Sequence, residues 1–406
     1  MLALLVAATL WYVHMLNRQI PGQRSGLLPR WIGTRAALQG QDPYSPEVLR
    51  QIQTAFYGHP LSTTDHANPE AFLYPAPLVL LLAPLAPLSW HGARLAFLWT
   101  AAPLLALSFW LCLRSLPVRA GPSARVALLA LAFFSWPSIW GLRLLQFTVP
   151  VLALVLVAWY LLARRHQVIP GVLLALVTIK PQLVLPMLAW LFLWSLSRRH
   201  WRLIISFSAA EAWLLAATEY VVPRWVGHWL ASLHNYTEVT NTAIPLEHLL
   251  GHWPGLVLTL AIAASSAAIL WKLRRAAPDS PEFGHAMSLL LATTVCLVPM
   301  NGPLIYNYVL LIPGCMLLAF SRQDGPITGT LRILALGQLA LDFAGVFLAA
   351  LTDIAGHPVP LFSLLPFLDY LLPPLVACAL AARMVQSLTA TQPSPSPAFD
   401  QPSVAV

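Results

Sequence analysis

The sequence predicts an all-α polytopic membrane protein, a bundle of about 12 transmembrane helices with a large first outer loop. The 406-residue chain is 58% hydrophobic and only 9% charged, and its mean hydropathy is +0.70. Soluble proteins carry about 25% charged residues, so a chain with so few must present apolar surface to lipid. Two further observations support this prediction: the chain contains a series of apolar runs of span length, and basic clusters occur in every second connection between them.

The N-terminal third predicts one span, one long loop and one irregular segment. Residues 1–16 have no basic leader and no small-x-small cleavage site, so we expect a first transmembrane helix rather than a signal peptide. The polar residues 17–71 form the first outer loop. Residues 72–90 are apolar but contain four prolines, which favours a broken or re-entrant segment over a full crossing.

The rest of the chain predicts a single transmembrane domain, residues 1–382, with a second outer loop at residues 223–250. We expect residues 383–406, rich in Pro and Ser, to form a disordered cytoplasmic tail. The remaining apolar runs are 93–113, 126–142, 145–163, 168–180, 181–197, 203–222, 255–271, 285–300, 303–320, 331–352 and 361–382.

Basic residues gather in every second connection between these runs. By the positive-inside rule these connections are cytoplasmic, both termini are cytoplasmic, and the two long loops face outward from a plasma membrane. The net charge of +8 is split among small clusters and forms no stripe, so we expect membrane lipids and no nucleic acid as partners. The clusters are Arg114/Arg119/Arg125, Arg164/Arg165, Arg198/Arg199/Arg202, Lys272/Arg274/Arg275 and Arg322/Arg332.

Cations stand where apolar runs meet the outer side. We expect the Arg94 side chain to extend along the apolar surface and place its charge in the interface, and Arg143 stands at a similar position. Lys180 differs because it separates two runs that are each short for a span, and broken membrane helices line cavities. A cation beside a free helix terminus suits a phosphate. Most acids also lie outside: Asp42, Glu47, Asp65, Glu70, Glu219, Glu238, Glu247 and Asp353.

Other polar residues in the runs favour structural roles. Glu211, Asp342 and Asp369 could form a proton or ion path, but no Lys or Arg lies at matching depth, which favours contacts inside the bundle. His248 and His252 have i, i+4 spacing, yet no metal motif surrounds them, and we expect neither a metal nor a cofactor. The cysteines show no disulfide or metal spacing and are expected to be buried: Cys112, Cys296, Cys315 and Cys378.

Four motifs in order resemble a known family. They are Asp42-Pro43-Tyr44, then Phe72-Leu73-Tyr74-Pro75-Ala76-Pro77, then Leu145-Gln146-Phe147, and finally Gly171 followed by Ile179-Lys180-Pro181-Gln182. In order and spacing, from about Trp11 to about Pro313, the chain is similar to the polyprenyl-phosphate-mannose-dependent mannosyltransferases of glycosyltransferase family 87, which have the GT-C fold.

The resemblance implies a reaction on the outer membrane face. A sugar passes from a polyprenyl-phosphate donor to a hydroxyl of a lipid or glycan acceptor, with inversion, and an acid of the first outer loop acts as base. Lys180 and Arg143 would stabilise the leaving phosphate. The resemblance makes the remaining substrate-binding candidates Gln182, Gln146, Tyr44, Tyr74 and His234.

The chain departs from the family at the expected acid, because that place falls on Gly26. Either Asp42, Glu47 or Asp65 substitutes, or the chain binds lipid-linked sugars without transferring them. Asp42 starts a turn in its motif, which makes it a poor base, so we expect slow transfer that Gly26→Asp accelerates. A transporter or flippase of lipid-linked intermediates is the third alternative, but such proteins show internal repeats that are not evident here.

Overall fold

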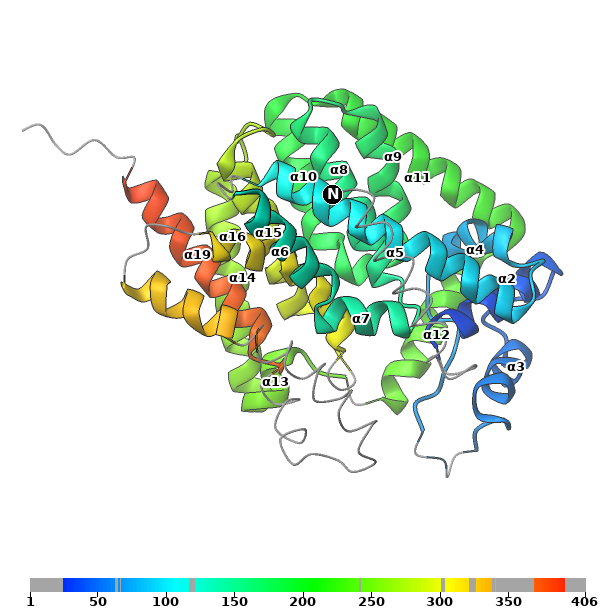
Figure 1. Ribbon diagram of the computed structural model, residues 1–406. Helices are drawn as coiled ribbons and strands as arrows, with labels where there is room; N and C mark the ends of the chain where they lie inside the picture. Colours follow the sequence, from blue (N-terminus) through cyan, green and yellow to red (C-terminus); the bar gives the residue numbers. More distant parts are fainter. Residues whose placement is uncertain are drawn as a thin grey trace, which may run out of the picture.

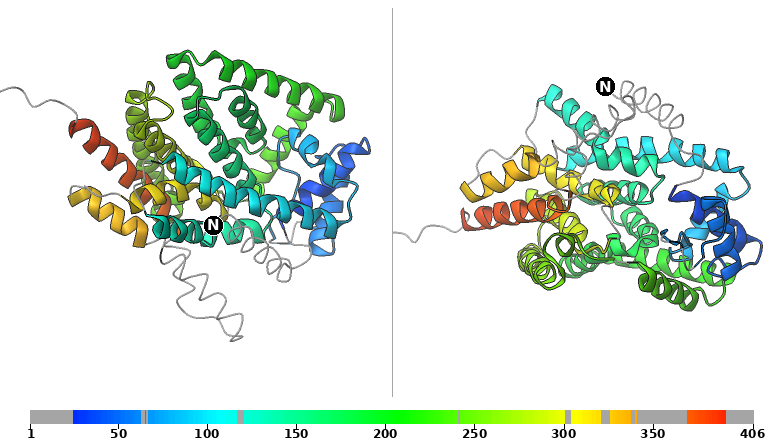
Figure 2. Two further views of the ribbon diagram at one scale, coloured as in Figure 1. Left: turned by 45° about the horizontal axis from the view of Figure 1, so that its top comes forward. Right: turned by 90° about the horizontal axis from the view of Figure 1, so that it is seen from below.

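The computed structural model describes residues 25–62, 65, 67–116, 121–240, 242–300, 304–320, 326–337, 340 and 369–390. In these ranges the regular elements are helices, with one isolated antiparallel bridge between Ala243 and Met300 (Figures 1 and 2). The expected first span at residues 1–16, Asp342, Asp353 and the tail beyond Ala390 lie outside the described residues.

Each described apolar run after residue 90 coincides with a helix or with two consecutive helices. The single helices are α5 (Trp90–Ser115), α8 (Thr148–Ala163), α11 (Trp201–Val221), α14 (His252–Lys272), α15 (Pro281–Leu297) and α19 (Leu372–Ala390). The divided runs are α6 (Pro122–Phe133) with α7 (Trp136–Arg143), α9 (Val168–Leu176) with η2 (Val177–Ile179), η3 (Pro181–Leu183) with α10 (Leu185–Arg198), and η4 (Ile305–Leu311) with α16 (Ile312–Ala319).

The helical membrane architecture is confirmed, but the count of about twelve spans is not. Among the described residues three helices are long and apolar enough to cross a bilayer, namely Trp90–Ser115, His252–Lys272 and Leu372–Thr389. A fourth span is formed if α6 and α7, which meet at a bend of 44°, cross together. Three of the expected runs, 1–16, 331–352 and 361–382, lie wholly or partly outside the described residues, and four others are divided into shorter helices, so the number of spans stays a prediction.

The two runs beside Lys180 form a hairpin. α9 begins after the turn at Arg164 and Arg165, and α10 ends at Arg198. These two turns and residues 277–279 line one small cavity, where Arg165 pairs with Asp279 at 3.3 Å. Both arms of the hairpin therefore start and finish at one end of the molecule, here called the basic end, and Lys180 lies at the tip.

The opposite end carries the segments expected as outer loops, and these contain helices (Figure 1). Residues 17–71 include α2 (Leu27–Leu38) and α3 (Pro46–Tyr57), and residues 223–250 include α12 (Trp225–Val239) and α13 (Pro245–Leu250). α3 has regular end signals: the Ser45 hydroxyl accepts from the Val48 N–H at 3.3 Å, and Gly58 ends the helix with φ of 90°.

The proline-rich segment does not cross as one helix, in agreement with the sequence. It forms α4 (Pro77–Leu82) and the 3₁₀ turn η1 (Ala83–Leu85). Six α-helical residues extend about 9 Å, far short of a hydrocarbon core of about 30 Å.

Residues 383–390, expected at the start of the disordered tail, are helical and continue α19. Met384 is buried, and the Arg383 Nε–H donates to His285 of α15 at 3.2 Å. Packing against α15 thus extends the helix beyond the point where the apolar run ends.

Candidate active site

A polar cavity of about 320 Å³ lies at the end opposite the basic end. It joins residues from α2, α3, η3, α12, η4 and six connecting segments. Four residues singled out from the sequence line it: Tyr74, Gln146, Lys180 and Gln182. Residues that the sequence did not single out as candidates complete the polar lining: Ser25, Arg30, Asn68, Glu70, Tyr236, Thr242, Tyr306 and Asn307.

Lys180 is 5% exposed and projects from the tip of the hairpin. Its ammonium donates to the Thr148 hydroxyl and to Asn307 Oδ1, the latter at 3.4 Å, and lies 5.2 Å from the centre of the Tyr306 ring. Within the described chain no carboxylate lies within 4 Å of it. A buried cation with only neutral partners is costly, and an anionic ligand would compensate it.

Arg30 and Glu70 form a second charged group in the cavity. Arg30 Nη1 and Glu70 Oε2 are 3.9 Å apart, and both side chains are largely buried. The Arg30 guanidinium also lies 4.7 Å over the Tyr74 ring, and its Nε has no hydrogen-bond partner among the described residues. The cavity thus holds two cations and one carboxylate, which leaves a positive balance suited to a phosphate.

The Glu70 segment is held in place by hydrogen bonds to its neighbours. The Tyr57 hydroxyl donates to the Asn68 carbonyl at 2.6 Å, and the Tyr236 hydroxyl donates to Asn68 Oδ1 at 3.1 Å. Trp229 donates to the Leu73 carbonyl at 3.1 Å. Burial raises the pKa of the Glu70 carboxyl above its usual range, while the Arg30 guanidinium acts in the opposite direction.

Gly26 also lines this cavity, beside Gln146. Its N–H donates to the Leu144 carbonyl at 2.7 Å. A Cβ on Gly26 would lie 2.5 Å from Gln146 Nε2, so an aspartate there must displace the Gln146 amide. The space that an acidic side chain at position 26 would fill is therefore occupied by the Gln146 amide.

Asp42 has the structural role that its turn suggests. Its Oδ1 accepts from the Tyr44 N–H at 3.0 Å, and its Oδ2 lies 2.8 Å from His228 Nδ1. The Tyr44 hydroxyl donates to the Tyr74 carbonyl at 2.7 Å, which ties the first outer motif to the second. Neither Asp42 nor Tyr44 lines the polar cavity.

Three other candidates also lie away from the cavity lining. Asp65 accepts from the Ser62 N–H at 2.7 Å in an exposed turn. Arg143 lies 5.2 Å from the Trp140 ring, and His234 pairs with Glu238 at 3.2 Å on the surface. The structure therefore groups Lys180, Gln182, Gln146 and Tyr74 and leaves these three outside.

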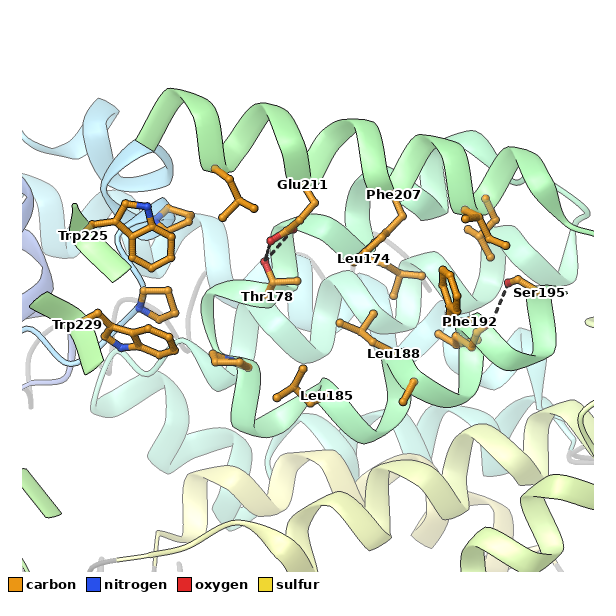
Figure 3. A pocket seen from close by; sticks show the side chains of 18 residues that line it. Leu174, Thr178, Leu185, Leu188, Phe192, Ser195, Phe207, Glu211, Trp225 and Trp229 are labelled. Atoms are coloured by element: carbon orange, nitrogen blue, oxygen red, sulfur yellow. Dashed lines mark hydrogen bonds between the residues drawn. The ribbon is translucent and has the colours of Figure 1, made fainter. Parts of the chain in front are cut away.

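An apolar groove of about 680 Å³ adjoins the polar cavity. Leu174 of α9, Leu188 and Phe192 of α10, and Phe207 of α11 line it, and Trp225 and Trp229 of α12 stand at one end (Figure 3). Residues from the same three segments, 73–77, 178–182 and 225–236, line both the groove and the polar cavity. An apolar chain in the groove would thus end beside the cations.

Groups outside the cavity have protein partners. Thr178 donates to Glu211 Oε2 at 3.2 Å across the groove, the structural contact expected for that acid. His248 stacks on Tyr370, and His252 pairs with Glu247 at 2.7 Å, so the two histidines do not converge. Asp369 is buried. All four cysteines are free, three of them buried and Cys378 half-buried.

Comparison with known families gives one match. The model of glycosyltransferase family 87 matches residues 72–299, which is more than half of the chain. Comparisons with curated proteins and with solved structures return no match. The matched region includes Tyr74, Gln146, Lys180 and Gln182 but begins after Gly26, Arg30 and Glu70. This chain therefore belongs to glycosyltransferase family 87 and is a helical membrane glycosyltransferase.

Proposed function

We propose that the chain transfers a mannose-like sugar from a polyprenyl-phosphate donor to a lipid or glycan acceptor at the outer face of the plasma membrane. The observation that carries this proposal is the junction of the two cavities. The segment 178–182 contributes Lys180 and Gln182 to the polar side and Thr178 and Pro181 to the apolar side. A polyprenyl phosphate has the same division, an anionic head joined to an apolar chain.

The two cations provide the electrostatics of the reaction. As the bond between the anomeric carbon and the phosphate oxygen breaks, charge gathers on the leaving polyprenyl phosphate. Lys180 and Arg30 lie in one buried cavity, where low dielectric strengthens their attraction to that charge. The acceptor hydroxyl attacks the opposite side of the anomeric carbon, so the product has inverted configuration.

The proposal is tested with purified protein in vesicles, labelled polyprenyl-phosphate hexoses and a lipid extract. We expect label to move from the donor to a new acceptor, with the opposite anomeric configuration. Movement of intact donor across the membrane without a new glycoside would indicate a flippase instead. Donor binding without transfer would indicate an inactive lipid-sugar-binding relative.

The groove predicts a dependence on the donor chain. Ile204 of α11 lines the groove, whereas its neighbour Ile205 is 64% exposed on the outside of the helix. Ile204→Trp is expected to raise the KM for a long-chain donor by about tenfold, because overpacking costs about 1–3 kcal/mol. The measurement compares KM values for donors with long and very short isoprenoid chains.

Ile205→Trp is the matched control and should leave both KM values unchanged. An equal rise in KM for the two donors in the Ile204 variant would mean that the groove does not hold the isoprenoid chain.

A further inference from the structure

Glu70 is a largely buried carboxylate to which the sequence analysis assigned no role. Its side chain is 20% exposed and lines the same cavity as Gly26, Lys180 and Arg30. In the described chain its nearest cationic partner is Arg30, at 3.9 Å, too far for a short hydrogen bond. Its oxygens are therefore not committed to strong donors, in contrast to those of Asp42 and Asp65.

Glu70 and Gly26 line the same cavity although they lie near opposite ends of the outer segment 17–71. Glu70 is therefore close to the position where the family pattern has its acid. Gly26 stands at the start of α2, and Glu70 lies 44 positions later, two residues before Phe72 of the Phe72–Pro77 motif. Both line one cavity with Lys180. From this geometry we infer that Glu70 is the general base of this enzyme and replaces the acid that is missing at position 26.

This step rests on the proposed function. Glu70 takes the proton of the acceptor hydroxyl, and the acceptor oxygen forms a bond to the anomeric carbon. The bond between that carbon and the phosphate oxygen breaks, and the electron pair leaves with the polyprenyl phosphate. The proton on Glu70 is then released to solvent.

Burial favours the protonated form of this base, and the Arg30 guanidinium opposes it by favouring the charged form. Without a nearby cation, burial would hold the carboxyl protonated and unable to accept a proton. Lys180 and the hydroxyls of Tyr74, Tyr236 and Tyr306 are the other titratable groups of the cavity. This assignment replaces the expectation that the native chain is slow because of Gly26.

The test compares Glu70→Gln with the native protein. We expect kcat to fall by about 10²- to 10⁴-fold, the usual contribution of a general base. Donor affinity, measured by binding of labelled polyprenyl-phosphate hexose, should change little because the cations remain. Glu70→Asp should retain part of the rate. Glu282→Gln, an exposed glutamate at the start of α15, is the matched control and should transfer at the native rate.

A pH profile separates a base from a residue that only positions Arg30. The base works deprotonated, so the native rate should fall as pH decreases through the pKa of Glu70. Because burial raises that pKa, the fall should begin at a higher pH than for an ordinary glutamate. In Glu70→Gln this acid limb should disappear. A merely structural loss would lower donor affinity and keep the limb.

Three outcomes would overturn the assignment. Native transfer that survives in Glu70→Gln would reject Glu70 while the proposed function stands. Slow native transfer that Gly26→Asp raises and Glu70→Gln leaves alone would restore the original expectation. A native protein that neither binds nor consumes the donor would reject the proposed function, and the assignment with it.

Discussion

Replacing Lys180 by methionine is expected to weaken donor binding by about 10- to 100-fold. Hydrogen bonds to charged groups are worth about 1.5–3 kcal/mol, and 1.4 kcal/mol corresponds to a factor of ten. The transfer rate should fall by a further large factor, because the charge on the leaving phosphate is greatest in the transition state. Equilibrium binding and single-turnover rates with labelled donor measure the two effects separately.

The fold should survive this substitution. Thr148 donates to Asn307 at 2.9 Å, so the two partners of Lys180 remain hydrogen-bonded to each other when the ammonium is removed. Loss of a buried charge without an anionic partner removes a desolvation cost, and the unfolding temperature should not fall. Lys272, the only other lysine in the sequence, is exposed at the end of α14, and Lys272→Met is the control. Unchanged donor affinity in Lys180→Met would exclude the phosphate role.

A second large effect is expected at Gly171, where α9 meets α11. A Cβ there would lie 2.7 Å from the Leu203 carbonyl oxygen and 2.8 Å from the Phe207 nitrogen, both backbone atoms. Gly171→Ala must push the helices apart and should lower the free energy of unfolding by about 1–3 kcal/mol. Denaturation in detergent measures this loss. Transfer should also fall, because both helices line the groove.

Gly227 provides the matched control for Gly171. It lies in α12, and a Cβ there would meet nothing within 4 Å. Gly227→Ala should be neutral or raise stability, since alanine favours a helix over glycine by up to about 1 kcal/mol. If both substitutions stabilise the protein, close packing of α9 on α11 does not contribute to the fold.

The sequence located helices better than spans. Hydropathy placed α5, α8, α11 and α14 within a few residues, because lipid-facing and buried helices are both apolar. The basic clusters at Arg164/Arg165 and Arg198/Arg199 also predicted that the two runs beside Lys180 begin and end on one side, as they do in the hairpin. α3 was missed within a polar loop although Ser45, Pro46 and Gly58 mark its ends.

Four of the twelve polar residues that line the cavity were predicted from the sequence. Lys180 and Gln182 were predicted to bind substrate because they interrupt an apolar segment. Gln146 and Tyr74 were predicted because they lie in motifs that resemble the family. Arg30 and Glu70 carry no local signal: each is an ordinary charge in an outer segment until folding brings it beside Lys180. Conversely, the motif at Asp42 and Tyr44 was visible, but its contacts join two segments, and neither residue lines the cavity.

The length of the hairpin determines how deep in the membrane Lys180 and the proposed phosphate site lie. From Val168 to the break at Lys180 the first arm contains 12 helical residues, which extend about 18 Å, whereas a hydrocarbon core is about 30 Å thick. The proposed phosphate site therefore lies at a distance from the basic end that the length of this arm fixes. In thicker bilayers the site lies farther below the opposite surface, and in thinner ones it approaches the headgroups. Hydrophobic mismatch would therefore change how far each sugar must be drawn into the membrane before it can react.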